Sequence, residues 1–194
     1  MQVIELIINE NDLQSGIDAV SVVESPAIEE NFIALAKHEL ELKEVDKEKR
    51  ILMGAALIPN KKIYRVNDKE EYYIFFSEDT VRQAMELFFK RGNQGQATVE
   101  HNNAYVPGMT VVESWLIEDE VHDKSKKYGF SLPKGTWMIS MKVDNDEVWS
   151  DVKEGKVKGF SIEGYFADKL EMSLEQVKKN ETINKLKQIL NGEI

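Results

Sequence analysis

Residues 51–76 read ILMGAALIPNKKIYRVNDKEEYYIFF, and this stretch decides the fold class. Its first apolar run ends at Pro59, and two further runs, KIYRV and EYYIFF, are separated by the turn-like pair Asn67-Asp68. Short runs rich in β-branched and aromatic residues, bounded by Pro, Asn or Asp, are typical of strands. The segment therefore predicts consecutive antiparallel strands.

The flanking sequence continues the strand pattern and adds helices. Ser77 begins a helix-start motif, and apolar residues then recur at helical spacing until Gly92. A second short helix is capped around Asn145 and closed by Gly155. The predicted elements outside the opening stretch are strands at residues 3–8, 16–23, 97–101, 109–119, 135–143 and 158–165, and helices at residues 77–91 and 147–154.

The sum is about eight strands and two or three helices with short connections, which predicts a β-dominated α+β fold built on a small closed or half-open barrel flanked by helices. Residues 28–45 fit a loop, an edge strand or a short helix, and the charged residues 39–50 predict a solvated connection. Residues 173–190 carry apolar side chains at helical intervals among lysines. We therefore expect a main domain at residues 1–170 and an amphipathic helical tail at residues 171–194.

The composition narrows the function classes. The 194 residues carry a net charge of −10, which disfavours nucleic acid as a partner because phosphate binding needs a basic surface. There is no cysteine, so thiolate catalysis and zinc–thiolate sites are excluded. No run approaches transmembrane length, and the first nine residues, broken by Glu5, are too short for a secretory signal. The expectation is a protein that binds neither nucleic acid nor membrane.

One serine stands out in the run KGFSIEGY at residues 158–165. Alternation along a strand places Ser161 and Glu163 on one face and Phe160 and Ile162 on the other. If the apolar face builds the core, Ser161 faces a cleft or solvent. The pattern equally fits a surface serine of an ordinary amphipathic strand.

A nucleophilic serine needs a base, and histidine has the suitable pKa near neutral pH. Of the three histidines, His101 follows a short strand in a polar setting, while His38 and His122 lie in charged segments typical of solvated positions. A hydrogen-bonded turn residue is the alternative role for His101. No two histidines have metal-binding spacing, so neither a metal nor another cofactor is expected.

Several motifs resemble those of the XkdF-like phage serine proteases. They are IPNKKIYR at residues 58–65, EHN at 100–102, GTWM at 135–138, DEVW at 146–149, VKEG at 152–155 and GFSIEG at 159–164. The similarity extends over residues 17–166. These proteases are similar to the prohead maturation proteases of tailed phages and, more distantly, to herpesvirus assemblins.

The resemblance implies an assemblin-like barrel in which a strand histidine and a strand serine form the catalytic pair. His101 and Ser161 match those two positions. It also implies that backbone N–H groups near Ala27 and Ile28 stabilise the oxyanion.

The acid that supports the histidine is expected on a strand after the serine, but nothing after Phe166 resembles that strand. The run IDAVSVVESPA at residues 17–27 does, so we interpret the chain as circularly permuted. In the simplest register the acid position falls on Ala19, and Asp18 serves only if the strand bulges or shifts. Glu163 and Glu100 are the alternatives, and a Ser–His dyad or an inactive relative is the remaining interpretation.

The function implied is a serine endopeptidase that matures the phage prohead by cleaving scaffold and capsid precursors. Such an enzyme would act in the bacterial host cytoplasm, inside the immature shell, with a homodimer or higher oligomer as a further expectation. The alternative is a non-catalytic capsid-assembly or scaffold-binding protein that keeps the protease fold. A general hydrolase is disfavoured because no G-x-S-x-G elbow is present.

Overall fold

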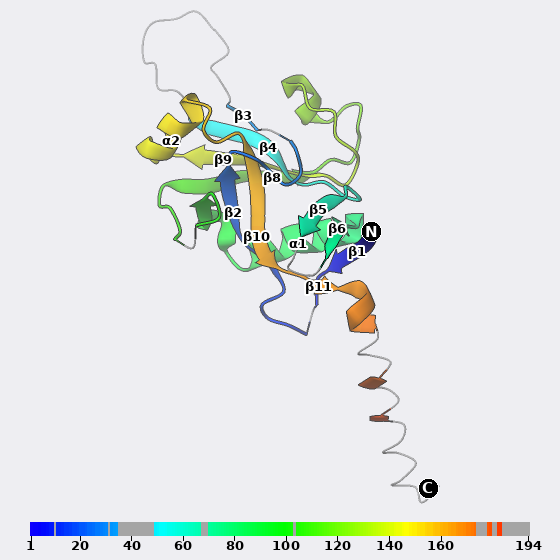
Figure 1. Ribbon diagram of the computed structural model, residues 1–194. Coiled ribbons are helices and arrows are strands. Elements are labelled where there is room, and N and C mark those ends of the chain that lie inside the picture. The colour runs from blue at the N-terminus through cyan, green and yellow to red at the C-terminus, as the bar shows by residue number, and fades with distance from the viewer. Residues whose placement is uncertain are drawn as a thin grey trace, which may run out of the picture.

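The computed structural model describes residues 1–9, 11–30, 32–34, 49–66, 70–102, 104–173, 178–179 and 182–183. It is a β-dominated α+β structure with three small sheets (Figure 1). The first sheet has the order β11-β1-β6-β5, with β1 Gln2–Ile7, β5 Ile63–Val66, β6 Glu71–Phe76 and β11 Ala167–Asp168. The second is β10-β2-β7, with β2 Gly16–Val23, β7 Ala97–Val99 and β10 Gly159–Tyr165. The third is β3-β4-β9-β8, with β3 Ile33–Ala34, β4 Ile51–Leu57, β8 Met109–Leu116 and β9 Trp137–Val143.

The hairpin predicted after β4 is confirmed, but the pairing predicted for β4 itself is wrong. β5 and β6 pair antiparallel, whereas β4 pairs with β9 and β3. β4 is an almost continuous apolar run with six of its seven residues buried, and β9 is equally buried. A strand buried on both faces belongs in the middle of a sheet, so β4 takes β9 as its partner far along the chain.

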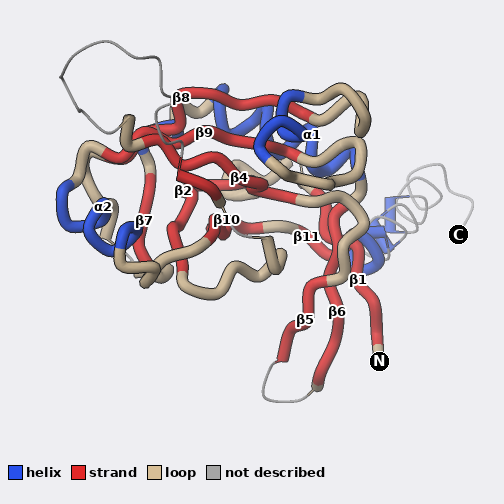
Figure 2. The backbone as a smooth tube through the Cα atoms, turned by 90° about the horizontal axis from the view of Figure 1, so that it is seen from above, coloured by secondary structure: helices blue, strands red, loops and turns tan. Residues whose placement is uncertain are grey.

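The described strands form no closed barrel, which corrects the barrel expectation. Each of the three sheets keeps two edge strands. β10 approaches β4 at Gly54, where an added Cβ would lie 3.2 Å from the ring of Phe160. The two strands thus meet by side-chain packing and share no ladder of backbone hydrogen bonds. Figure 2 shows the β1–β6–β5 sheet extending away from the rest of the strands.

Two α-helices begin at capping residues near those predicted. α1 (Glu78–Lys90) has Ser77 as its N-cap, and α2 (Asp146–Lys153) has Asn145, whose side chain accepts a hydrogen bond from the N–H of Val148 at 3.0 Å. α1 buries Phe88, whose ring centroid lies 5.5 Å from that of Trp137 in β9. Short 3-10 helices occupy Asn93–Gly95 and Lys124–Tyr128.

The serine strand, β10, lies beside β2 from the first part of the chain, as the permutation hypothesis requires. β10 pairs antiparallel with β2, and β2 pairs on its other side with β7 in parallel. Figure 1 shows β2 and β10 side by side along most of their length. Segments from the start, the middle and the end of the chain therefore build one sheet.

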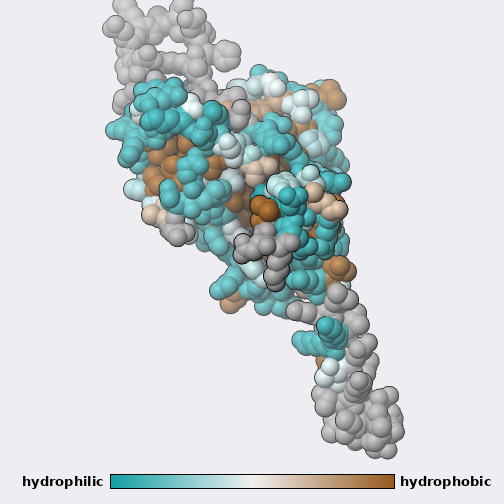
Figure 3. Space-filling view, in the orientation of Figure 1, coloured by the Kyte–Doolittle hydropathy of each residue, from teal (hydrophilic) through white to brown (hydrophobic). Residues whose placement is uncertain are grey.

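Several predictions fall wholly or partly outside the described residues: the solvated connection at residues 39–50, the turn at Asn67-Asp68, most of the segment 28–45, and much of the tail. Of the tail, residues 171–173, 178–179 and 182–183 are described, and they are helical. Among the described residues, no helix combines the length and apolarity needed to cross a bilayer. Hydrophilic side chains cover much of the face shown in Figure 3, with apolar side chains gathered near its centre and upper left.

Candidate active site

Three neighbouring strands align three hydroxyl side chains in one row. Ser161 of β10 lies opposite Ser21 of β2, and Ser21 is in register with Thr98 of β7. Residues in register on adjacent strands share a face of the sheet. Ser161, Ser21 and Thr98 are 9%, 0% and 1% exposed, respectively. On the opposite face Phe160 is fully buried in the core, in agreement with the predicted alternation.

His101 lies in a tight turn directly after β7, held over the same face. Its backbone N–H donates to the Oγ of Ser21 at 3.1 Å, and the N–H of Glu100 donates to the carbonyl of Val22 at 3.1 Å. Glu100 and His101 both adopt the left-handed backbone region, with φ of 50° and 55°. That conformation costs about 1–2 kcal/mol per non-glycine residue, so the bonds to β2 hold the turn in a strained geometry.

The carboxylate of Glu163 is the acid that the structure places next to His101. The Nδ1 atom of His101 lies 3.3 Å from the Oε1 atom of Glu163, and the hydroxyl of Thr98 donates a hydrogen bond to the same oxygen. The side chains of His101 and Glu163 are 47% and 26% exposed. A carboxylate fixed by a neighbouring strand and facing Nδ1 can orient an imidazole and stabilise its protonated form.

The other two acids considered from the sequence take different places. The β10–β2 register shifts between Glu163 and Gly164, whose partners are Ala19 and Ile17, so Asp18 is the extra residue of a β-bulge. The bulge that an Asp18 role requires is thus present. Asp18 is exposed, however, and its carboxylate has no hydrogen bond or ion pair within the described part of the chain. Glu100 accepts a hydrogen bond from the N–H of Glu24 at 2.5 Å and so closes the His101 turn.

A cavity of about 190 Å³ opens at the free edge of β10, and Ser161 lines it. Ala27 and Ile28 line the same cavity. They lie in a turn closed by the hydrogen bond from the N–H of Glu29 to the carbonyl of Pro26 at 2.8 Å. Among the described residues, neither the N–H of Ala27 nor that of Ile28 finds an acceptor. Free N–H groups beside a nucleophile are the donors that an oxyanion hole requires.

Ser161 and His101 are both linked to Ser21, and no hydrogen bond joins them directly. Among the contacts of the described residues, none engages the hydroxyl of Ser161, and His101 does not line the cavity. Ser21 separates the two, because it faces Ser161 across the strand pair and binds the N–H of His101. In unliganded active sites the bond from nucleophile to base is often long and tightens when substrate binds.

The other histidines make no comparable arrangement. His122 is exposed and bonds through Nδ1 to Asp119 at 2.8 Å, and this hydrogen bond lowers the pKa of the Asp119 carboxyl to about 2. His38 lies outside the described residues. In the described part of the chain, no three His, Asp or Glu side chains gather in a way that could hold a metal ion.

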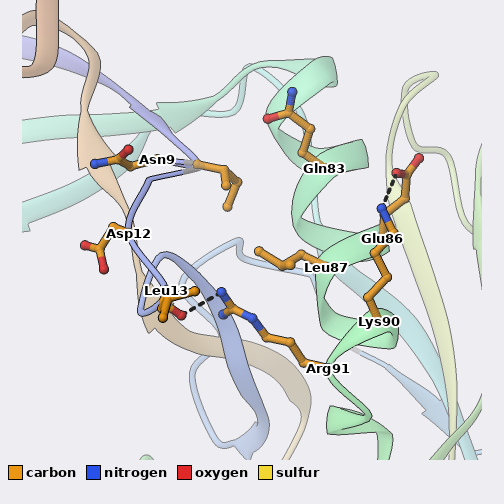
Figure 4. Close-up of a pocket in the computed structure, with 9 residues that line it drawn as sticks. Asn9, Asp12, Leu13, Gln83, Glu86, Leu87, Lys90 and Arg91 are labelled. Carbon is orange, nitrogen blue, oxygen red and sulfur yellow. Dashed lines mark hydrogen bonds and ion pairs between the residues drawn. The ribbon is translucent and has the colours of Figure 1, made fainter. Parts of the chain in front are cut away.

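A second hollow, between residues 9–13 and α1, contains none of the candidate residues (Figure 4). Its cations already have partners there. Arg91 donates to the carbonyl of Leu13 at 2.7 Å, and Lys90 lies 3.8 Å from Glu86. The candidate chemistry is therefore concentrated at the β10–β2–β7 sheet.

Two supporting residues were not predicted from the sequence. Thr98 positions Glu163, and Ser21 positions the backbone of His101. Both are hydroxyl residues in otherwise apolar strands, and a buried hydroxyl needs a hydrogen-bond partner. That signal marks them as members of a polar site once the strand order is known.

Comparison with known proteins gives a family but no characterised relative. No curated protein and no solved structure matches the sequence. Residues 39–171 match the family described as "Putative phage serine protease XkdF". This segment contains His101 and Ser161, together with most of the core, and the chain belongs to this family.

Proposed function

We propose that the protein is a serine endopeptidase in which Ser161 is the nucleophile, His101 the general base and Glu163 the supporting acid. The observation that carries the proposal is the row Ser161–Ser21–Thr98 with the His101–Glu163 contact above it. Family membership supports the same activity. Asp18, the acid first inferred from the permuted register, is replaced in this proposal by Glu163.

The chemistry follows acyl transfer. The Oγ of Ser161 attacks the scissile carbonyl carbon, and its proton passes to the imidazole of His101. Glu163 stabilises the resulting imidazolium, while the free N–H groups of Ala27 and Ile28 bind the oxyanion. The imidazolium then gives its proton to the leaving amine as the C–N bond breaks. Water then attacks the carbonyl carbon of the acyl-enzyme while His101 takes its proton. The imidazolium returns a proton to the Oγ of Ser161 as the ester bond breaks.

The biological role we propose is maturation of a phage prohead, with scaffold and capsid precursors as substrates, in the host cytoplasm and inside the immature shell. Resemblance to prohead proteases supports this role, as does membership of a phage protease family. We further propose an assemblin-like arrangement in which β2, placed beside β10, supplies from the front of the chain the strand expected after the serine.

Labelling with a biotinylated fluorophosphonate tests the nucleophile directly. We expect wild type to be labelled at Ser161, with labelling lost in Ser161→Ala and reduced in His101→Ala. Ser131→Ala, which removes an exposed hydroxyl, is the matched control and should label like wild type. Mass spectrometry of the labelled peptide identifies the site.

Co-expression with the cognate scaffold tests the role. Wild type should shorten the scaffold and Ser161→Ala should leave it intact, as seen by gel and by the new N-termini. The enzyme proposal is wrong if the fluorophosphonate does not label wild type and if capsid shells still form normally with Ser161→Ala. The protein would then be an assembly protein with a protease fold.

A further inference from the structure

The cavity beside Ser161 is apolar except for one cation. Its walls come mainly from aliphatic and aromatic side chains of β4, β5, β6 and β10, together with the Ala27–Ile28 turn. Arg65 is the only charged residue among the described residues that line it. An arginine in such surroundings is unusual, because a buried charge normally has a partner of opposite sign.

Strand alternation explains how Arg65 reaches the cavity. Ile63 and Arg65 lie on the same face of β5, opposite Ile74 and Tyr72 of β6. Ile63 and Ile74 also line the cavity. Arg65 is half-buried, and this burial lowers the pKa of its guanidinium below the ordinary value. The guanidinium remains charged at every physiological pH.

Arg65 has no acidic partner among the described residues. Its one hydrogen bond there runs from Nη1 to the carbonyl of Tyr64 at 3.0 Å. Glu71 lies on the other face of the hairpin, the face of Tyr64 and Tyr73. The nearby Lys61, by contrast, lies 3.6 Å from Glu29 and also donates to the carbonyl of Ile28. Among the described residues, Arg65 is thus the cation at this cavity that has no acidic partner.

We propose that Arg65 selects an acidic side chain, glutamate or aspartate, at the substrate residue that carries the scissile carbonyl. The inference rests on the proposed protease function. Ser161, Ala27 and Ile28 line the cavity. A substrate residue whose carbonyl is held by these three residues therefore has its side chain beside the walls of the cavity. The apolar walls accommodate methylene groups, and the guanidinium offers a planar fork that matches a carboxylate.

Three tripeptide diphenyl phosphonates test the proposal. They differ only in the side chain next to phosphorus, which is that of glutamate, glutamine or lysine. In each reaction the Oγ of Ser161 forms a bond to phosphorus, phenoxide leaves, and His101 takes the hydroxyl proton. A hydrogen bond between charged groups corresponds to about a 10- to 100-fold difference in rate. We expect wild type to react faster with the glutamate reagent than with the glutamine reagent by that factor.

Variants assign the preference to Arg65. Arg65→Gln should react equally with the glutamate and glutamine reagents, Arg65→Lys should keep part of the preference, and Arg65→Glu should favour the lysine reagent. Arg82→Gln removes an exposed arginine of α1 and should behave like wild type. A fluorophosphonate without a peptide side chain should label all these variants at the same rate, which shows that the nucleophile is intact.

The outcomes separate the two proposals. The acidic specificity is overturned if wild type reacts equally fast with the glutamate and glutamine reagents, or if Arg65→Gln keeps the preference of wild type. The protease proposal still stands in either case if the fluorophosphonate labels Ser161. Failure of the fluorophosphonate to label wild type overturns the protease proposal and the specificity with it.

Discussion

Glu163 is the residue on which the proposed mechanism depends most. Its carboxylate has two partners from different elements, the hydroxyl of Thr98 and the imidazole of His101. The sequence already places Glu163 on the same strand face as Ser161, but nothing local shows which histidine it meets. That contact depends on β2 lying between β10 and β7, and strand order is a long-range property.

The acid can be assigned by two amide substitutions. Glu163→Gln keeps an oxygen for Thr98 but removes the charge that stabilises the imidazolium, so we expect kcat to fall about 100- to 10,000-fold. Asp18→Asn should leave kcat within about twofold, because surface substitutions away from the site have small effects. Cleavage of the cognate scaffold measures both. A large loss in Asp18→Asn with normal activity in Glu163→Gln would return the acid role to Asp18.

At the scale of elements, the β10–β2 pair is shaped by a close backbone approach at the bulge. A Cβ added to Gly164 would lie 2.0 Å from the carbonyl oxygen of Gly16 and 2.8 Å from the Cα of Ile17. Only glycine fits where two backbones come this close. The bulge changes the direction of β2 near its start, next to the Glu163–Ala19 pair. It thereby fixes the position of the strand that carries Glu163.

Gly164→Ala should therefore destabilise the fold. The added methyl group meets backbone atoms that cannot rotate away. Overpacking typically costs about 1–3 kcal/mol, and we expect the free energy of unfolding to fall by at least this amount. Gly95→Ala is the matched control, since no atom lies within 4 Å of the added Cβ. Urea unfolding followed by tryptophan fluorescence compares them. Equal stability of both variants would show that the β10–β2 pair is looser than described.

Strand positions and the β5–β6 hairpin could be predicted from local sequence patterns, but the partners of strands far apart in the sequence could not. Alternation and turn residues place β2, β4, β6 and β10 within a residue or so of their observed bounds. The partner of β4 was predicted as its neighbour in sequence and is instead β9. Local propensity carries no information about which distant strand completes a sheet, and the barrel expectation was overturned for the same reason. Arg65 illustrates the limit at the site, because its strand was predicted and the cavity it faces was not.

The whole molecule depends on strands outside the segment that defines its family. The family match covers residues 39–171, yet β1 and β2 precede it. β2 is the central strand of the sheet that carries Ser161, and Ile17, Val20 and Val22 are fully buried in the core. The matched segment alone would leave β7 and β10 without their shared partner. β1 and β2 are therefore part of the same folded domain as Ser161.

Two truncations test this dependence. A chain lacking residues 1–30 should lose its cooperative thermal transition, because a central strand and its core residues are removed. A chain ending at residue 173 should melt within about 2 °C of the full chain, since the described core lies between Ile4 and Phe166. Circular dichroism at increasing temperature gives both results. A cooperative transition in the first variant would contradict the central role of β2.

The order of strands in the β10–β2–β7 sheet also sets when the candidate site can form during synthesis. β2 leaves the ribosome early, the turn that anchors His101 to Ser21 is 80 positions further on, and Ser161 follows later still. Pairings between segments so far apart form slowly, and only after all partners have emerged. Ser161, His101 and Glu163 thus come together only when nearly the whole domain has been made, and the proposed activity is delayed until then.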